Sequence, residues 1–372
     1  MDVSGKYSTW TEINLIALQN NIRSVANTSG APVMAVVKAN AYGHGAIPVA
    51  KAALQAGAVW LAVARIEEAL DLRQAGLTCP ILLLGYTPPE RLGTAIQNQL
   101  SLTVWNADQV KTAAMISQSV GSQARLHLKV DTGMSRLGVQ IEAAQDLART
   151  IANSKGILFE GIFTHFAKAD EADPGPTDQQ EQQFQRVLRA LEKDGIRPDF
   201  VHAANSAASL TRTCASYDLV RAGISIYGLH PSQVCPLPAS FQPVLSWRAV
   251  LSQVKTLPAG RGVSYGHEYI TSARERIGTI PVGYADGFRR IKHNQVLVGG
   301  RRVPVVGRVC MDQIMVQLDG VPEAQAGDEV VIIGEQGGDK ITAEQVAKRW
   351  GTINYEVVCG IGPRVPRLYL TA

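Results

Sequence analysis

A lysine placed directly after an apolar run is the residue of this 372-residue sequence best suited to covalent chemistry. Lys38 follows the run Val33 to Val37 and precedes a polar segment, Ala39 to Gly45, that contains two glycines. Five consecutive apolar residues predict a strand buried on both faces, so the ammonium group passes from a dry interior directly into a loop. Burial lowers the pKa of an amine, and a neutral amine can attack a carbonyl to form an imine. The alternative is a lysine whose alkyl chain only covers the end of a strand.

Further polar side chains follow later apolar runs at the equivalent position. Lys129 and Asp131 end one run, His165 ends the next, and His202 and Arg221 end the two after it. Parallel barrels carry their reacting groups where strands end and the following loops begin. We therefore expect these side chains to line one site, although each alone could be a satisfied polar residue at a strand end.

The elements that must position these residues are short apolar runs alternating with amphipathic windows. The windows have apolar residues at three-and-four spacing, as in Ala46 to Gln55 and Ile141 to Ala152, which predicts helices. Eight alternating units, with no G-x-G-x-x-G after the first strand, favour a (β/α)8 barrel of the TIM type over an open doubly wound sheet. The expected strands are Val33 to Val37, Trp60 to Val63, Ile81 to Leu84, Leu102 to Val104, Arg125 to Val130, Leu158 to Thr164, Phe200 to His202 and Leu219 to Arg221.

The pattern changes after about Pro231. Four prolines from Pro231 to Pro243 mark a linker, and short β-rich runs with Gly and Pro turns follow. Only Thr342 to Trp350 is strongly helical there, with Thr342 as the expected N-cap. The sequence thus predicts an α/β barrel over residues 1–235 and a smaller, mostly β C-terminal domain over residues 236–372. Residues 1–13 include a strand-like stretch that could pack with the β domain.

Composition excludes several classes of protein. Apolar residues make up 46% of the chain and charged residues 18%, but no segment approaches the roughly 20 apolar residues that span a bilayer. The first six residues lack the basic start and apolar block of a secretion signal, which predicts a cytoplasmic protein. The net charge of +4 is scattered, so nucleic acid is not an expected partner. Five cysteines without a C-x-x-C pair predict reduced thiols and no metal site.

Two segments could bind phosphate. Asn205-Ser206-Ala207 opens a short helix after the seventh expected strand, and Arg221-Ala222-Gly223-Ile224 forms a glycine turn after the eighth. Phosphate needs several converging donors, which helix starts and glycine turns supply through backbone amides. Phosphates bind at these two loops in many barrels. Each signal alone is weak because glycine turns are common.

The segment around the lysine is long and specific enough to indicate a family. Ala35 to Gly45 resembles the pyridoxal-phosphate attachment segment of the alanine racemase family, in which the lysine holds the cofactor as a Schiff base. Further segments resembling that family follow in the same order as far as Tyr355. The resemblance implies pyridoxal 5'-phosphate as cofactor, and it implies that the cofactor phosphate is bound by Tyr42, Ser206, Gly223, Ile224 and Tyr355.

The resemblance also implies an unusual partner for the cofactor ring. Arg221 would face the pyridine nitrogen and His165 would hydrogen-bond this arginine. A carboxylate would keep the nitrogen protonated, whereas a permanently charged arginine leaves it an acceptor and the ring a weaker electron sink. A weaker sink disfavours transamination and favours simple proton exchange at Cα. The alternative is an ion pair at the barrel rim.

Inversion of a stereocentre by two bases requires one base on each face of a planar intermediate. Gly262-Val263-Ser264-Tyr265-Gly266 resembles the family segment that bears the base opposite the lysine. Lys38 and Tyr265 would therefore exchange the α-proton on the D and L sides of a cofactor imine. A phenol needs nearby cations or donors to act as a base near neutral pH. The following His267-Glu268 departs from the polar pair expected in the family.

Other segments resemble those that bind the substrate. Asp131 to Gly138 resembles the loop whose arginine, here Arg136, receives the substrate carboxylate, with Ser135 in place of an expected glycine. Gly307 to Asp312 resembles the segment in which Met311 and Asp312 line the pocket. Lys129 matches a lysine that is carbamylated in some relatives. Two tyrosines would narrow the entrance to admit little more than a methyl side chain, namely Tyr284 and Tyr355.

The resemblance predicts an alanine racemase that interconverts L-alanine and D-alanine for peptidoglycan, as a homodimer whose active sites are shared between subunits. A serine or broad-spectrum racemase of the same fold is the nearest alternative. A barrel metallohydrolase could use His127, Lys129, His165 and His202, but it needs an H-x-H at the first strand, where this chain has Val36-Val37-Lys38. A non-catalytic cofactor carrier built on a lone barrel would lack the second domain.

Overall fold

The computed structural model describes residues 6–212 and 215–371, which form two compact units. One unit comprises Ala17–Gln242, and the other comprises the N-terminal residues to Ile16 together with Pro243–Ala372. Cys79, Cys235 and Cys310 are free thiols, and Cys214 lies outside the described residues. Among the described residues no helix has both the length and the apolar character needed to cross a membrane.

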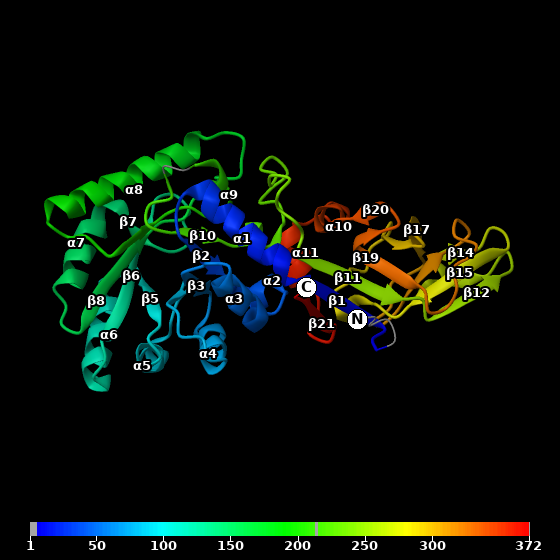
Figure 1. Ribbon diagram of the computed structural model, residues 1–372, viewed down its shortest axis with the longest axis horizontal. Helices are drawn as coiled ribbons and strands as arrows, with labels where there is room; N and C mark the ends of the chain where they lie inside the picture. The colour runs from blue at the N-terminus through cyan, green and yellow to red at the C-terminus, as the bar shows by residue number, and fades with distance from the viewer. Residues whose placement is uncertain (1–5, 213–214, 372) are drawn as a thin grey trace. The chain divides into compact units, whose positions relative to one another are not determined.

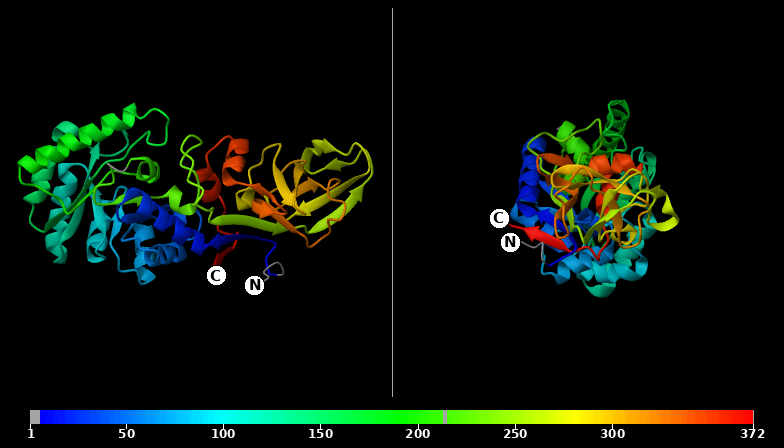
Figure 2. Two further views of the ribbon diagram at one scale, coloured as in Figure 1. Left: turned by 45° about the horizontal axis from the view of Figure 1, so that its top comes forward. Right: turned by 90° about the vertical axis from the view of Figure 1, so that its right-hand side faces the viewer.

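The first unit is the (β/α)8 barrel that the sequence predicts. Its strands are parallel in the order β10-β2-β3-β4-β5-β6-β8-β9, and backbone hydrogen bonds from Asp218 to Val201 and from Arg221 to Ala204 join the segments of the two end strands. The strands lie inside a layer of helices (Figures 1 and 2). They are β2 Val33–Val36, β3 Trp60–Val63, β4 Ile81–Leu83, β5 Ser101–Val104, β6 Ala124–Asp131, β8 Ile157–Phe163, β9 Phe200–His202 and β10 Val220–Ala222, with β7 Val139–Gln140 paired to β6.

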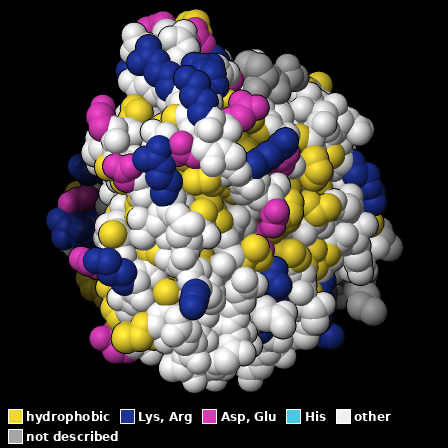
Figure 3. Space-filling model, turned by 90° about the vertical axis from the view of Figure 1, so that its left-hand side faces the viewer, with side chains coloured by type: hydrophobic (Ala, Val, Ile, Leu, Met, Phe, Trp, Pro, Cys, Tyr) yellow, Lys and Arg dark blue, Asp and Glu magenta, His cyan; other side chains and the backbone are white. Residues whose placement is uncertain are grey.

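Helices cover the barrel because each presents an apolar stripe. In α7 the buried residues are Ala144, Leu147, Ala148 and Ile151, which recur at three-and-four spacing. The unit's helical elements are α1 Leu15–Ser29, α2 Lys38–Tyr42, α3 Ala46–Gln55, α4 Ile66–Gln74, α5 Pro89–Gln97, α6 Ala107–Val120, α7 Ile141–Ala152, α8 Gly175–Lys193, α9 Ser206–Thr211 and the 3-10 turn η2 Ile224–Tyr227. On the face shown in Figure 3, basic and acidic side chains are interspersed rather than gathered in a stripe.

The second unit is mostly β, as predicted. Its main sheet has the order β12-β15-β18-β17-β16-β19-β11-β1-β21, in which β1 pairs antiparallel with β11 and parallel with β21. The N-terminal strand therefore belongs to this unit. The strands are β1 Thr9–Asn14, β11 Leu245–Val250, β12 Gln253–Leu257, β13 Gly262–Val263, β14 Tyr269–Ile270, β15 Glu275–Ile280, β16 Gln295–Val298, β17 Arg301–Val306, β18 Ile314–Gln317, β19 Glu329–Gln336, β20 Asp339–Ile341 and β21 Arg367–Leu370.

Aromatic packing holds the helices of this unit on its sheet. Strand β11 alternates buried and half-buried residues, and its buried Trp247 contacts Phe288, which in turn contacts Trp350 at ring-centroid distances of 6.3 and 5.9 Å. Thr342 caps the helix as predicted, because its hydroxyl accepts from the Gln345 amide. The helical elements are α10 Ala343–Trp350, α11 Asn354–Cys359 and the 3-10 turns η3 Tyr265–His267 and η4 Tyr284–Asp286.

Candidate active site

Lys38 leaves the end of β2 and enters a left-handed turn. The four residues after it, Ala39 to Tyr42, have φ values between 52° and 53°. L-amino acids in this conformation cost roughly 1–2 kcal/mol each, so a run of four needs compensating contacts. This turn could not be predicted from the sequence, because the four residues include no glycine.

Two side chains stabilise the turn. Glu68 on α4 accepts a hydrogen bond from the Ala39 amide at 2.5 Å and others from the amides of Ala64 and Arg65. The Asn40 side chain accepts from the Ala46 amide at 2.8 Å. Glu68 thus joins the lysine turn to the next βα loop, and sequence reasoning missed it because its partners are backbone groups.

Tyr42, at the end of the turn, is directed at the glycine turn after β10. The residue is buried, its ring lies 4.9 Å from that of Tyr227, and the Tyr227 hydroxyl donates to the Val36 carbonyl at 3.0 Å. A Cβ built on Gly223 would lie 2.5 Å from the Tyr42 hydroxyl. Glycine is therefore required here for the close approach.

Ser206 completes this group. Its Oγ accepts from the Gly223 amide at 2.9 Å and from the Ser225 hydroxyl at 3.1 Å, and Asn205 caps the helix that Ser206 begins. The structure thus brings together Tyr42, Ser206 and Gly223 with Ile224, the first residue of η2. Hydroxyls and backbone amides that converge in this way suit a phosphate.

Arg221 is buried two residues before this turn and is held by four neighbours. Its Nη1 donates to Nδ1 of His202 at 2.8 Å, and its Nη2 donates to the carbonyls of Thr164 and Ala203 at 2.8 Å and approaches Nδ1 of His165 at 3.4 Å. Burial lowers the pKa of Arg221 to about 9, so the guanidinium stays charged at neutral pH. The predicted contact between His165 and Arg221 is present at this longer distance.

The barrel mouth gathers positive charge. Burial, and then the charges of Arg221, Arg136, Lys129 and Lys38, hold the pKa of His165 well below its usual value. Burial and the same neighbouring cations lower the pKa of Lys129 to about 8. Lys38, Lys129, Arg136 and Arg221 thus all contribute to the positive potential at His165. Such a cluster suits an anionic substrate or cofactor.

The loop that carries Arg136 is organised by Asp131. The Asp131 carboxylate accepts from the amides of Gly133 and Ser135 at 3.0 Å. Partial burial acts to raise the pKa of Asp131, but these backbone hydrogen bonds outweigh it and the pKa is lowered. Ser135 has a φ of 55°, a conformation that glycine adopts without strain.

In the second unit, Tyr265 projects from a tightly held hairpin. It is 69% exposed and lies between Ser264 and Gly266, which have φ values of 64° and 70°. The Ser264 hydroxyl donates to the Arg308 carbonyl at 2.6 Å, and the Arg308 guanidinium pairs with Glu268 at 2.6 Å. The His267-Glu268 departure thus supplies an ion pair that fixes the tyrosine loop.

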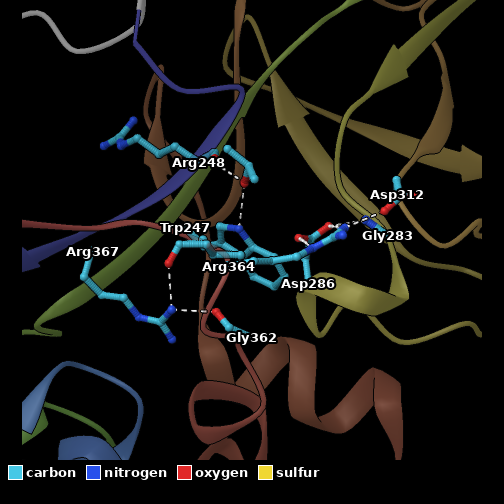
Figure 4. A network of polar contacts seen from close by, with 10 residues as sticks. Trp247, Arg248, Gly283, Asp286, Asp312, Gly362, Arg364 and Arg367 are labelled. Atoms are coloured by element: carbon cyan, nitrogen blue, oxygen red, sulfur yellow. Dashed lines mark hydrogen bonds and ion pairs between the residues drawn. The ribbon is translucent and has the colours of Figure 1, made fainter.

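Arg364 joins the loops that carry the other predicted pocket residues of this unit (Figure 4). It donates to both oxygens of the buried Asp286 at 2.6 and 3.0 Å and to Asp312 at 2.8 Å. Asp286 ends the turn that begins with the exposed Tyr284, and the Ala285 amide donates to the Met311 carbonyl at 3.0 Å. Sequence reasoning missed Arg364, because the three loops it connects are far apart in the chain.

Tyr355 lies on α11 and is half-buried. Ile353, two residues earlier, is 60% exposed, and Met311 is 52% exposed. The predicted residues of the second unit, Tyr265, Tyr284, Met311, Asp312 and Tyr355, therefore include several exposed apolar side chains.

The histidines proposed for a metal in the alternative hypothesis are engaged otherwise. Nδ1 of His127 lies 3.1 Å from Nε2 of His202, and both rings are fully buried. Among the described residues no group of three or more His, Cys, Asp or Glu could hold a metal ion.

The group formed by Tyr42, Ser206 and Gly223 is called the anion cradle below. Together with Lys38 and the buried Arg221 at the ends of parallel strands, it is typical of an enzyme of the (β/α)8-barrel class. Comparison with known families is more specific. Residues 13–231 match the N-terminal domain model of alanine racemase, and residues 244–369 match the C-terminal domain model. The chain belongs to the alanine racemase family.

Individual relatives cover the whole chain. It is 46% identical to an alanine racemase of Symbiobacterium thermophilum over 99% of both chains, and 44% identical to one of Desulfovibrio desulfuricans over 99% of this chain and 100% of the relative. The crystal structure of alanine racemase from the D-cycloserine producer Streptomyces lavendulae is similar with a TM-score of 0.93 at 40% identity, covering 98% of this chain and 97% of the other. These matches favour an alanine racemase over the metallohydrolase alternative.

Proposed function

We propose that the protein interconverts L-alanine and D-alanine with pyridoxal 5'-phosphate as its cofactor and supplies D-alanine for peptidoglycan. The observation that carries the proposal is the anion cradle of Tyr42, Ser206 and Gly223 two residues beyond the buried Arg221, in a chain that matches the alanine racemase family throughout. The cradle suits the phosphate, and the arginine suits the ring nitrogen.

The residues present fit the cofactor. A Cβ at Gly223 would lie 2.5 Å from the Tyr42 hydroxyl, so glycine here lets the tyrosine oxygen approach the turn whose amides would face the phosphate. When bound, the cofactor supplies an electron-withdrawing ring that makes the α-proton of an amino acid acidic. Lys38 would hold its aldehyde carbon, Arg221 its ring nitrogen with His165 behind the guanidinium, and the phosphate would be held by Tyr42, Ser206, Gly223, Ile224 and Tyr355.

Arg221 determines how strongly electrons are withdrawn. A guanidinium has no acceptor and keeps its proton, so it donates a hydrogen bond to the ring nitrogen without protonating it. Electron withdrawal stays moderate, and proton exchange at the α-carbon is favoured over transamination. The neutral His165 behind it adds no positive charge, since the pKa of His165 is well below neutrality.

Lys38 and Tyr265 hold and move the α-proton on opposite faces, with the lysine amine serving the D side and the tyrosine oxygen the L side. Tyr265 is largely exposed in its own unit, so a partner subunit can receive it at its barrel mouth. The protein would therefore act as a homodimer with active sites shared between subunits.

The remaining residues select the substrate. Arg136 pairs with the substrate carboxylate, and the loops fixed by Arg364 place the side chains that limit the substrate to a small one. A lysine with a pKa of about 8 is roughly one tenth neutral at pH 7, which supports carbamylation of Lys129 by CO2 beside Arg136. The backbone of Met311 and the Asp312 side chain would line the pocket, and Tyr284 and Tyr355 would narrow its entrance.

A cytoplasmic location accompanies this proposal. Cys79, Cys235 and Cys310 are free thiols, the state that a reducing compartment maintains. Fractionation followed by immunoblotting would test the location, and sedimentation with and without cofactor would test the dimer.

The activity is tested by measuring alanine and serine racemisation side by side in wild type and Tyr265→Phe, with exposed Tyr7→Phe as the matched control. Wild type and the control should racemise alanine far faster than serine. Tyr265→Phe should lose most turnover and, in deuterated solvent, should still exchange the α-proton of D-alanine. Full racemisation by Tyr265→Phe would exclude the two-base scheme.

A further inference from the structure

A chain of buried hydrogen bonds runs through the barrel interior behind Arg221. Arg221 donates to Nδ1 of His202 at 2.8 Å, Nε2 of His202 faces Nδ1 of His127 at 3.1 Å, and Nε2 of His127 faces the Glu160 carboxylate at 3.1 Å. Arg221, His202, His127 and Glu160 are all less than 5% exposed. Four polar groups are thus connected in a dry interior, where unsatisfied groups are costly.

The fold makes specific provision for this chain. Strands β6 and β8 shift register between Leu126 and His127, so that Gly161, not Glu160, pairs with His127. Such a bulge redirects the side chain of the extra residue, here Glu160. A Cβ on Gly161 would lie 2.3 Å from the His127 ring, so glycine leaves the space that the ring occupies.

Aromatic rings fix the two imidazoles in place. The His202 ring stacks on Phe163 at a centroid distance of 4.7 Å and an interplanar angle of 10°. The Trp60 ring meets His127 edge-on at 5.5 Å. Neither ring can leave its plane without disrupting this packing.

The two ends of the chain set the direction of every hydrogen bond. Arg221 can only donate, so Nδ1 of His202 must accept and its proton must be on Nε2. That proton is donated to Nδ1 of His127, whose own proton must then be on Nε2 and is donated to the Glu160 carboxylate. A second proton on either ring would set two donors against each other. Both histidines are therefore neutral, with the charges at Arg221 and Glu160.

The surroundings of each end agree with this assignment. Burial acts to raise the pKa of Glu160, but hydrogen bonds from His127, Ser101 and Arg125 lower it, so the group is a carboxylate. Burial and the charge of Arg221 hold the pKa of His202 well below its usual value. The Arg125 guanidinium reaches Glu160 from the half-exposed end of the chain at 3.0 Å.

We propose that Glu160 is a positioning residue for the racemase reaction: through the fixed tautomers of His127 and His202 it orients Arg221 toward the cofactor ring. This proposal rests on the proposed function, since Arg221 is the residue that would contact the ring nitrogen. Without the carboxylate, His127 can place its proton on Nδ1. His202 would then turn an N–H toward the arginine, and the guanidinium would lose its acceptor.

The tautomers can be measured without any turnover. Nitrogen-15 NMR of histidine-labelled protein should show His127 and His202 neutral and protonated at Nε2 from neutral to mildly alkaline pH, in the wild type. An Nδ1-protonated or doubly protonated ring at either position would overturn the proposal. This result does not depend on racemisation, so a failure of the proposed function would be seen separately as absent turnover.

The kinetic test compares Glu160→Gln with Arg125→Gln. Both remove the ion pair at 3.0 Å, but only Glu160→Gln removes the carboxylate from His127. Glu160→Gln should lower kcat for alanine about tenfold or more, with KM changed much less. Losses of about this size follow when a carboxylate that hydrogen-bonds the second ring nitrogen of a functional histidine is removed. It should also change the absorption spectrum of the bound cofactor. Arg125→Gln should change neither.

Equal kinetic losses in the two variants would show that Glu160 acts only through the ion pair and would contradict the proposal. Unchanged kcat in Glu160→Gln would contradict it as well. If Glu160→Gln does not fold, the wild-type NMR measurement still decides whether the tautomers are as inferred.

Discussion

Gly161→Ala should destabilise the barrel far more than an ordinary glycine substitution. The new Cβ would lie 2.3 Å from Nδ1 and 2.4 Å from Cε1 of His127, whereas carbon atoms normally stay beyond about 3.4 Å. The ring would have to move by about 1 Å, which would break its hydrogen bonds to His202 and Glu160, both 3.1 Å long. Overpacking costs about 1–3 kcal/mol and unsatisfied buried groups cost a further 1–3 kcal/mol or so.

These terms give a loss near 4 kcal/mol. For a unit of this size, about 3 °C of melting temperature corresponds to 1 kcal/mol, so the barrel's transition should fall by about 12 °C in a calorimetric scan. Gly93→Ala is the matched control. Its Cβ would meet only Ile116 and Val120 at 3.7 Å, and alanine is favoured over glycine in a helix by roughly 0.5–1 kcal/mol, so this variant should melt slightly higher. Equal melting of Gly161→Ala and wild type would refute the packing of the His127 ring against β8.

Three further variants probe the site. Ser135→Gly should raise the free energy of unfolding in urea by up to about 1 kcal/mol, because the residue has a φ of 55°, and a lower stability would show that the loop is unstrained. In CO2-free buffer, where Lys129 is a free amine, the group is neutral in the folded state above its pKa of about 8 but protonated in the unfolded chain up to about 10.4, so the free energy of unfolding should rise by about 3 kcal/mol across that pH window. Lys129→Met should abolish that rise, and a pH profile identical to wild type would contradict the assignment. Arg364→Lys cannot bridge Asp286 and Asp312 at the same time, so KM for alanine should rise severalfold while the fold persists, and an unchanged KM would show that the bridge is dispensable.

Much of the fold follows from the order of apolar runs. Strands such as β3 are buried along their whole length, so continuous apolar stretches such as Trp60 to Val63 predict them well. The bounds of helix α5 were not predicted, because it begins at Pro89 after Pro88 and paired prolines usually indicate a loop. Here the second proline occupies the first turn of a helix, a position that lacks an intrahelical partner for the amide in any case.

The site was less predictable where it depends on contacts between distant segments. Lys38, Arg221 and His165 follow apolar runs, and that position alone suggested a common site. Glu160 lies in the middle of a strand, and only the register shift between β6 and β8 reveals that its side chain meets His127. Arg364 was missed for a similar reason, since three loops must be assembled before it has partners.

The central claim, that one amine at the end of β2 carries pyridoxal phosphate, is tested most directly by chemical trapping. The absorption spectrum of the purified protein should be recorded before and after borohydride, and the reduced adduct located by peptide mapping. The account predicts a visible absorption band that borohydride abolishes and a pyridoxyl group on Lys38 alone. Labelling of a different lysine, or a colourless protein that racemises alanine after Lys38→Ala, would contradict it.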